Sequence, residues 1–278
     1  MTGKLRNIVL YGAIFSVTWG AAGRVLAEAG KSFSFGVIAD IQAGDKETKI
    51  GRYYRESFAR LEECVSELNR HDLAFTIELG DLIDGNAEKT ASDLDRVMEE
   101  YSKLSMPTYH VLGNHGMSSV RNLMSRKLNS NVFYYDFTVP AAEGWRFIVL
   151  DGNDAGYGVL GSKQLEWLKS KLDQARADQE KIILFNHFAL LESAAPQVRM
   201  KTPEPVLGWI NESGCVVAYF AGHDHAGGYA CQNGIHHITV KGMVEAPVKN
   251  AYAVIEVYSD KLVEIGFGKE PSRKMKFK

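Results

Sequence analysis

The chain has 278 residues, of which 45% are hydrophobic and 24% charged, and its formal net charge is −2. This composition is ordinary for a water-soluble globular protein, and the length suffices for one large domain or two small ones. The charge balance excludes the clearly basic surface that binding to a nucleic-acid polymer needs, so no such polymer is expected as a partner.

The N-terminal segment, residues 1–27, has the pattern of a secretory signal peptide. Basic residues precede an apolar run over residues 8–19, and small residues at positions 25–27 resemble a cleavage site. A membrane anchor is the alternative, but the run is short for a spanning helix and Arg24 interrupts its continuation. We therefore expect export to a periplasm or out of the cell. Residues 28–278 then form one mature domain with no stable membrane anchor after cleavage.

The cysteine count is odd in a chain that is expected to be exported. Of Cys64, Cys215 and Cys231, at most two can share a disulfide. Cys64 falls in a helical pattern and Cys215 opens a strand, so both are typical of small buried apolar residues. The chain has no Cys-x-x-Cys spacing, which disfavours a structural zinc site.

Beyond the N-terminal segment, apolar strand-like runs alternate with amphipathic helical segments. The expected strands are Phe33–Ala39, Leu73–Leu79, Thr108–Leu112, Arg146–Leu150, Lys181–Phe185, Val216–Phe220, His236–Val240, Ala251–Val257 and Lys261–Gly266. Helices are expected at Arg52–Asn69, near Ser92–Leu104, and after Ser162 as N-cap. Several strands are near-continuous apolar runs, as in sheets covered on both faces, so the pattern indicates one α/β domain.

Polar residues follow five of these strands at the point where each strand ends. The strands concerned end at Ala39, Leu79, Leu112, Phe185 and Phe220. In open α/β sheets, ligands bind in the crevice beyond the carboxyl ends of the strands. Asp, Asn and His at the same kind of position on five strands therefore indicate one shared site.

The polar segments supply the ligand types of a binuclear metal centre. They are Asp40-Ile41-Gln42, Gly80-Asp81-Leu82-Ile83-Asp84-Gly85, Gly113-Asn114-His115, Asn186-His187 and Gly222-His223-Asp224-His225. Carboxylate, imidazole and amide ligands suit divalent manganese, iron or zinc, and a carboxylate bridges metals about 3.5–4 Å apart. Taken singly, Asp40 and Asp81 are equally typical of helix N-caps, Asn114 of a turn and His187 of a structural histidine. Only the combination favours metal binding.

In their order, strand-end placement and glycines, the five segments resemble the calcineurin-like metallophosphoesterase superfamily. The resemblance implies a two-sheet β-sandwich flanked by helices, with a dinuclear metal site at the carboxyl ends of the strands. It also implies that residues 28–278 form a catalytic domain that hydrolyses phosphate esters or anhydrides. Asp81 would bridge two divalent metal ions. The other metal ligands implied are Asp40, Gln42 and His225 at the first site, and Asn114, His187 and His223 at the second.

The resemblance further implies how the reaction proceeds. The metals share a hydroxide that attacks phosphorus in line. His115, oriented by Asp84, protonates the leaving oxygen or binds the phosphoryl oxygens, to which Asn114 also contributes. Arg52 is the best further candidate to bind a substrate phosphate, although a surface role is the simpler interpretation. The histidines outside the motifs, His71, His110, His236 and His237, are expected to be structural or surface residues.

Gln42 distinguishes this chain within the superfamily, which usually has Asp-x-His in the first segment. An amide oxygen is a harder and weaker donor than imidazole, so manganese is expected, with magnesium, iron and zinc as alternatives. Asp84 occupies the position of the metal-binding tyrosine of purple acid phosphatases, which disfavours that branch. The Gln variant resembles manganese-dependent ADP-ribose/CDP-alcohol diphosphatases. That likeness includes Arg52-Tyr53-Tyr54-Arg55 and extends from Phe33 to Met275.

The chain departs from these diphosphatases in three places. Gly116 replaces the usual Glu, Asp224 replaces Thr between the last two histidines, and the stretch between Asp151 and Gly161 lacks a long insertion. Three functions therefore remain open. The first is a diphosphatase acting on a small nucleotide-like substrate such as ADP-ribose or a CDP-alcohol. The second is a broad exported phosphodiesterase or phosphomonoesterase. The third is a phosphate-ligand binding protein without turnover.

Overall fold

The computed structural model describes residues 30–85, 88–115, 117–245 and 248–278, and the expected signal peptide at 1–27 lies outside them. Export and the mature-domain boundary at residue 28 therefore stay predictions. In the described part of the chain, no helix combines the length and apolar content that crossing a bilayer requires. The described chain contains two six-stranded mixed sheets and five α-helices, which confirms the expected α/β class.

The first sheet has the strand order β12-β11-β10-β1-β2-β3. Its strands are β1 (Phe33–Ile38), β2 (Phe75–Glu78), β3 (Thr108–His110), β10 (Ala251–Val257), β11 (Lys261–Gly268) and β12 (Arg273–Lys276). The second sheet has the order β4-β5-β6-β7-β9-β8. Its strands are β4 (Tyr135–Phe137), β5 (Trp145–Val149), β6 (Lys181–Phe185), β7 (Val216–Ala221), β8 (Gly228–Gln232) and β9 (Ile235–Thr239).

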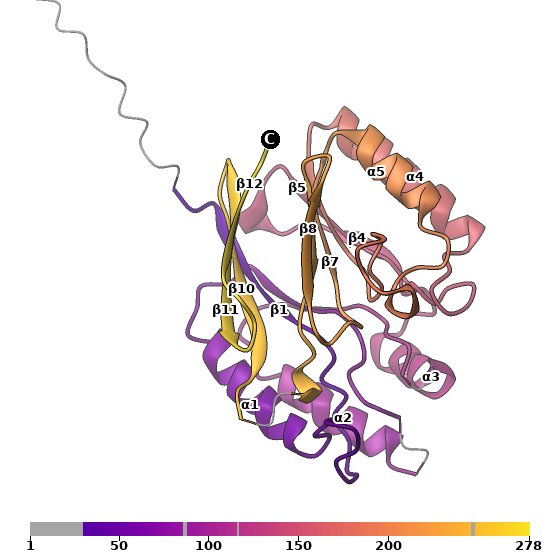
Figure 1. Ribbon diagram of the computed structural model, residues 1–278, viewed down its shortest axis with the longest axis vertical. Helices are drawn as coiled ribbons and strands as arrows, with labels where there is room; N and C mark the ends of the chain where they lie inside the picture. Colours follow the sequence, from indigo (N-terminus) through magenta and orange to yellow (C-terminus); the bar gives the residue numbers. More distant parts are fainter. Residues whose placement is uncertain (1–29, 86–87, 116, 246–247) are drawn as a thin grey trace, which may run out of the picture.

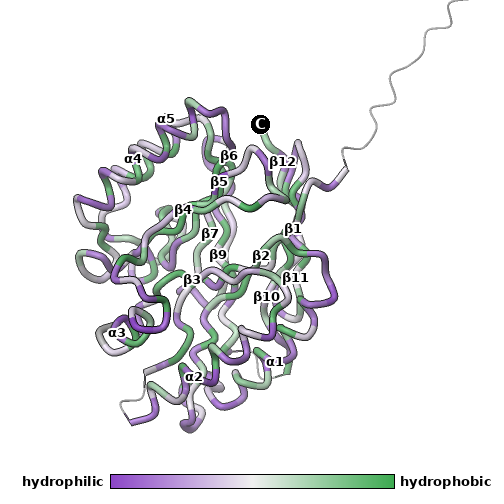
Figure 2. The backbone as a smooth tube through the Cα atoms, turned by 180° about the vertical axis from the view of Figure 1, so that it is seen from behind, coloured by the Kyte–Doolittle hydropathy of each residue, from purple (hydrophilic) through white to green (hydrophobic). Residues whose placement is uncertain are grey.

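The helices lie on the outer faces of the two sheets, so the molecule has four layers (Figure 1). They are α1 (Glu56–Leu68), α2 (Thr90–Tyr101), α3 (Met117–Leu128), α4 (Ser162–Ala177) and α5 (Glu204–Ser213). One apolar cluster joins α1, α2 and α3 to the first sheet, and another joins α4 and α5 to the second. Hydrophobic residues accordingly gather along the strands, whereas the helices mix hydrophilic and hydrophobic residues (Figure 2).

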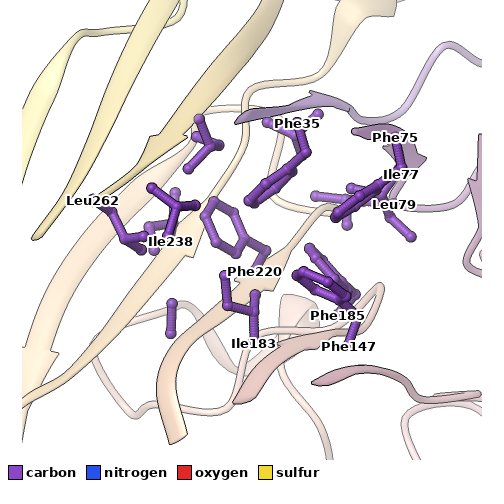
Figure 3. Packing of buried hydrophobic residues seen from close by; sticks show 14 of the residues in the cluster. Phe35, Phe75, Ile77, Leu79, Phe147, Ile183, Phe185, Phe220, Ile238 and Leu262 are labelled. Carbon is purple, nitrogen blue, oxygen red and sulfur yellow. The ribbon is translucent and has the colours of Figure 1, made fainter. Parts of the chain in front are cut away.

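Aromatic side chains fill the space between the two sheets. Figure 3 shows Phe35 and Phe75 of the first sheet facing Phe185 and Phe220 of the second. The Phe35 ring stacks on Phe75 at 4.8 Å and meets the edges of Phe185 and Phe220 at 5.9 and 5.8 Å. Such aromatic pairs add about 0.5–1.5 kcal/mol each beyond the area they bury. The core therefore fixes the position of the two sheets relative to each other.

Parallel pairing brings the polar strand ends to one edge. β1, β2 and β3 pair in parallel, and so do β5, β6, β7 and β9. The carboxyl ends of parallel strands meet at the same sheet edge, and the segments after β1, β2, β3, β6 and β7 carry the expected ligands. The aromatic core packs the two sheets against each other. The ligands after the strands of the first sheet and those after the strands of the second therefore face a common centre.

The structure corrects several local expectations. The first helix begins at Glu56 rather than Arg52, because residues 49–52 form a hydrogen-bonded turn before it. Ser162 is the first helical residue and not the N-cap. The extended Gly161 is the N-cap, and its N–H is tied to Asp154 Oδ2. The strands β4, β8 and β12 and the helices α3 and α5 were not expected. All three cysteines are free, with Cys64 buried and Cys231 exposed.

Candidate metal centre

The structure brings together all seven residues expected to bind metal. Side-chain ligand atoms of Asp40, Asp81, His187 and His223 lie within 4.8 Å of one another. The remaining three residues contact this group. Gln42 Nε2 is 3.3 Å from Asp81 Oδ2 and 3.2 Å from His225 Nε2, and Asn114 Oδ1 is 2.8 Å from His187 Nε2. The seven side chains therefore form one cluster at the shared sheet edge.

His187 is oriented by a backbone carbonyl on its outer side. Its Nδ1 lies 2.8 Å from Leu79 O, which only accepts, so Nδ1–H must be the donor. In the neutral ring the lone pair is then on Nε2, which faces Asn114 Oδ1 at 2.8 Å and Asp81 Oδ2 at 3.4 Å. A lone pair aimed at two oxygen acceptors favours a cation between them, either a proton or a metal ion.

His225 is oriented in the same way by Glu245. The carboxylate Oε1 of Glu245 accepts from Nδ1–H of His225 at 3.0 Å. The Nε2 of His225 then faces Asp40 Oδ1 at 3.3 Å. Outer carboxylate and carbonyl partners commonly fix the tautomer and orientation of metal-binding histidines. Sequence motifs gave no indication of Glu245, which follows β9 and lies 20 residues from His225.

His223 has a tyrosine as its outer partner. Tyr157 O–H donates to Gln197 O at 2.9 Å, so the same oxygen accepts from Nε2–H of His223 at 2.6 Å. This arrangement leaves Nδ1 of His223 unprotonated and available to a cation. Tyr157 lies in the short stretch between Asp151 and Gly161, and the sequence motifs did not identify it.

Two buried oxygens of the cluster have no hydrogen-bond partner. They are Asp40 Oδ1 and Gln42 Oε1. A buried acceptor without a donor costs about 1–3 kcal/mol. A bound divalent cation would satisfy such oxygens, and carboxylate, amide and imidazole donors together suit manganese or iron. The donor set therefore fits a dinuclear centre of divalent metal ions.

The pKa values reflect how closely the charges are packed. Burial lowers the pKa of His187, but the adjacent Asp81 carboxylate outweighs it and the pKa rises to about 9. Burial likewise opposes the ionisation of Asp81, but His187 and His115 hold its pKa well below the usual range. For His223, burial and the neighbouring His187 lower the pKa to about 4. Asp81 is thus a carboxylate at neutral pH.

Glycine at positions 80 and 113 permits this packing. A Cβ on Gly113 would lie 2.1 Å from Asp81 Oδ1 and 2.2 Å from the Asp81 amide nitrogen. A Cβ on Gly80 would lie 2.6 Å from His187 Nδ1, and Gly80 also has a φ of +103°. Both positions therefore exclude any side chain, as their place beside metal-type ligands suggests.

His115 and Asp84 lie beside the cluster. His115 Nδ1 is 2.6 Å from Asp84 Oδ1, so Nδ1–H donates to the carboxylate, and the ring Nε2 is 3.8 Å from Asp81 Oδ2. Lys46, which the sequence motifs did not single out, makes a second ion pair with Asp84. Arg52 Nε is 3.8 Å from Glu245 Oε1, so this cation stands near the first group of ligands. These contacts place a partly exposed imidazole and two cations at the rim of the centre.

The histidines outside the motifs have separate positions. His110 Nδ1 lies 3.5 Å from the buried Glu78 Oε2, and His71 Nε2 lies 3.3 Å from Glu67 Oε1. His236 Nε2–H donates to Lys276 O at 3.0 Å. These three histidines have structural partners. His237 is buried, and its Nδ1 has no hydrogen-bond partner.

Comparison with known proteins agrees with this geometry. Residues 33–227 match the family model described as calcineurin-like phosphoesterase. A manganese-dependent ADP-ribose/CDP-alcohol diphosphatase from Oryza sativa is 33% identical, with 88% of this chain and 94% of the relative covered. The Homo sapiens protein of the same name is 29% identical, covering 88% of this chain and 93% of the relative.

Solved structures extend the comparison. A dimetal phosphatase from Danio rerio is similar with a TM-score of 0.79 and 25% identity, over 90% of this chain and 100% of that chain. A purple acid phosphatase from Lupinus luteus has a TM-score of 0.59 at 14% identity, covering 87% and 52% of the two chains. The second likeness extends to the fold alone.

Proposed function

Because the chain belongs to the calcineurin-like phosphoesterase family and is a metallophosphoesterase, we propose that it is a manganese-dependent diphosphatase acting on nucleoside diphosphate derivatives. The substrate class is that of ADP-ribose or a CDP-alcohol, and the bond cleaved is the phosphoanhydride. The observation that carries the proposal is Gln42, whose amide lies within the cluster between Asp81 and His225. Relatives named for this activity support it, with about 30% identity along most of both chains.

The choice of metal rests on the same residue. A 180° rotation of the Gln42 amide exchanges Nε2 and Oε1, and would turn the unpartnered oxygen toward Asp81 and His225. An amide oxygen beside two carboxylates makes the first site harder than an imidazole would, which favours manganese over zinc. The relatives' names also specify manganese.

Each residue then has a defined part in hydrolysis. Bound divalent metal ions supply an activated water and neutralise charge on the phosphoryl group. His115 is the general acid, because its Nδ1–H is held by Asp84 and its Nε2 is directed toward the centre. A proton on Nε2 passes to the leaving oxygen as the anhydride bond breaks. Lys46 and Arg52 add positive charge at the rim, where the second phosphate of a diphosphate would lie.

A substrate panel tests the proposal. Purified protein loaded separately with manganese, magnesium, zinc or iron is mixed with ADP-ribose, CDP-choline, bis-p-nitrophenyl phosphate and p-nitrophenyl phosphate. We expect the manganese form to cleave ADP-ribose or CDP-choline to two monophosphates, identified by mass spectrometry. Intact ADP-ribose and CDP-choline beside hydrolysed p-nitrophenyl esters would refute the proposal. Asp81→Asn serves as the inactive control, since it removes the charge at the centre with little change in shape.

A broader phosphodiesterase is the second candidate. The alignment with the Oryza sativa relative spans 304 positions, whereas 88% of 278 residues is about 245, so roughly 304 − 245 = 59 positions have no counterpart in this chain. The shortened stretch between Asp151 and Gly161 lies beside the centre, since Tyr157 contacts His223, and a centre without a covering insertion accepts bulkier esters. If this candidate is correct, kcat/KM for bis-p-nitrophenyl phosphate will equal or exceed that for ADP-ribose and CDP-choline.

A further inference from the structure

A cavity of about 200 Å³ adjoins the candidate metal centre on the outer face of the second sheet. Its walls are residues 189–191, 193 and 194 of the segment after His187, Asp224 and Gly227 after β7, and the ends of β7, β8 and β9. Ala221 and Thr239, which end β7 and β9, pair side by side at the sheet edge that carries the metal-type ligands. The cavity therefore lies at the same edge of the second sheet as the centre.

The wall of the cavity contains a polar group without a partner. His237 is only 8% exposed, and its Nδ1 is buried with no hydrogen-bond partner. Burial and the neighbouring His236 lower the pKa of His237 to about 4, so the ring is neutral at physiological pH. A neutral imidazole in this position suits a small polar ligand and does not repel a cation.

Asp224 is the acidic residue among those that line the cavity. It stands between His223 and His225 in the chain. Its Oδ1 accepts a hydrogen bond from the Ala226 amide at 3.3 Å, and no cation of the described chain forms an ion pair with it. The nearby Lys241 instead donates through Nζ to Ala226 O. A carboxylate thus faces the cavity beside a centre that handles phosphate anions, without a protein cation to neutralise it.

We propose that this cavity binds the alcohol portion of the substrate and that Asp224 selects a positively charged aminoalcohol. The inference rests on the proposed function and names the substrate class more closely. A carboxylate without a protein cation as ion-pair partner repels a phosphate and attracts an ammonium group, so a substrate with the ammonium next to its phosphates satisfies both. The cavity is of the size for a small alcohol, not for a nucleoside diphosphate as a whole.

The test compares two substrates that differ only in charge. CDP-choline carries a trimethylammonium group, and CDP-3,3-dimethylbutanol carries a neutral tert-butyl group of the same shape. A partly exposed ion pair contributes up to about 1 kcal/mol, so kcat/KM should favour the choline ester about five-fold. Asp224→Asn and Asp224→Thr should each lower this ratio to about one, because the charge is gone.

Two further variants distinguish the effect of the Asp224 charge from the effect of substrate occupying the cavity. Glu192→Gln removes a negative charge from an exposed residue of the segment after His187 that does not itself line the cavity, so the ratio should stay at its wild-type value. Ala230→Trp, at the position opposite His237, narrows the cavity and should lower kcat/KM for both esters together. Thermal unfolding of every variant checks that each is folded.

The outcomes distinguish this inference from the function on which it rests. Equal kcat/KM for the two esters in the wild-type protein, or a ratio that survives both Asp224 variants, would overturn the aminoalcohol selection alone. An Ala230→Trp protein that cleaves both esters as fast as wild type would show that the substrate does not occupy the cavity. Failure to cleave the two esters and ADP-ribose, with p-nitrophenyl esters hydrolysed, would overturn the diphosphatase proposal and this inference together. Failure with the two esters beside cleaved ADP-ribose would overturn this inference alone.

Discussion

Gly113→Ala is the smallest change that should damage the centre without removing a ligand. The added Cβ would lie 2.1 Å from Asp81 Oδ1 and 2.2 Å from the Asp81 amide nitrogen. Even the closest tolerable contact, 3.0 Å, requires a displacement of 3.0 − 2.1 = 0.9 Å. Asp81 cannot easily move alone, because its Oδ1 accepts from the His115 amide at 2.8 Å and the residue is buried.

The expected loss follows from that displacement. A misplacement of about 1 Å costs about 100-fold in rate. Disturbing the support of a metal ligand typically weakens metal affinity about 10- to 100-fold. We therefore expect Gly113→Ala to lower kcat/KM about 100-fold, with weaker manganese binding. The forced contact should also destabilise the fold by about 1–3 kcal/mol.

The assay measures turnover of whichever substrate of the panel the wild-type protein cleaves fastest, and calorimetry measures manganese binding. Gly208→Ala is the matched control, because a Cβ at this helical position meets nothing within 4 Å. That control should be stabilised by about 0.5–1 kcal/mol through helix propensity, with unchanged activity and metal affinity. Gly113→Ala protein that binds manganese and turns over substrate like the wild type would refute the dependence of the centre on the position of Asp81.

Three further predictions concern the surroundings of the centre. Tyr157→Phe removes the acceptor for His223 Nε2–H and should weaken manganese binding about 10-fold in calorimetry, whereas an unchanged Kd would exclude this support. Manganese binding should tighten as the pH rises toward about 9, because His187 must lose its proton first; a pH-independent Kd would contradict this. Burial raises the pKa of Glu264 to about 8. At pH values between the ordinary carboxyl pKa and this value, Glu264 is protonated in the folded state and ionised in the unfolded state. Stability in urea should therefore fall as the pH rises through this window, and Glu264→Gln should flatten the profile; equal slopes would refute the assignment.

The central strands were predictable from sequence, whereas three of the four edge strands, β4, β8 and β12, were not. β1, β6 and β10 are covered on both faces, so their near-continuous apolar runs mark them clearly. β8 lies at a sheet edge and is mostly exposed, so its sequence shows no apolar alternation. β4 has only three residues, all half-buried. Edge strands of this kind are defined by pairing partners rather than by their own residues.

The same distinction applies to the candidate site. Ligand segments such as Gly80-Asp81 and Gly113-Asn114 can be recognised from a few consecutive residues, because a strand end, a tight turn and a ligand follow one another in the chain. The supporting contacts are not local: Tyr157 lies 66 residues from His223, and Glu245 lies 20 residues from His225. Neither has a motif, and both are brought in by the packing of loops around the sheet edge. Sequence therefore indicates which atoms face the centre and that Asp84 orients His115, but not that Tyr157 and Glu245 orient two of the ligands.

Backbone strain marks the centre independently of any motif. Eight described non-glycine residues have positive φ, and four of them are expected ligands: Asp40, Gln42, Asp81 and His223, at 51°, 41°, 61° and 67°. The left-handed region costs an L-residue about 1 kcal/mol or more. Glycine would remove that cost but would supply no ligand atom. The surrounding hydrogen bonds, such as that from the backbone N–H of Gln42 to the backbone oxygen of Asp81 at 2.8 Å, stabilise the strained conformation. Such a concentration of strain is expected where ligand geometry outweighs local stability, which is why backbone propensity alone could not have located these residues.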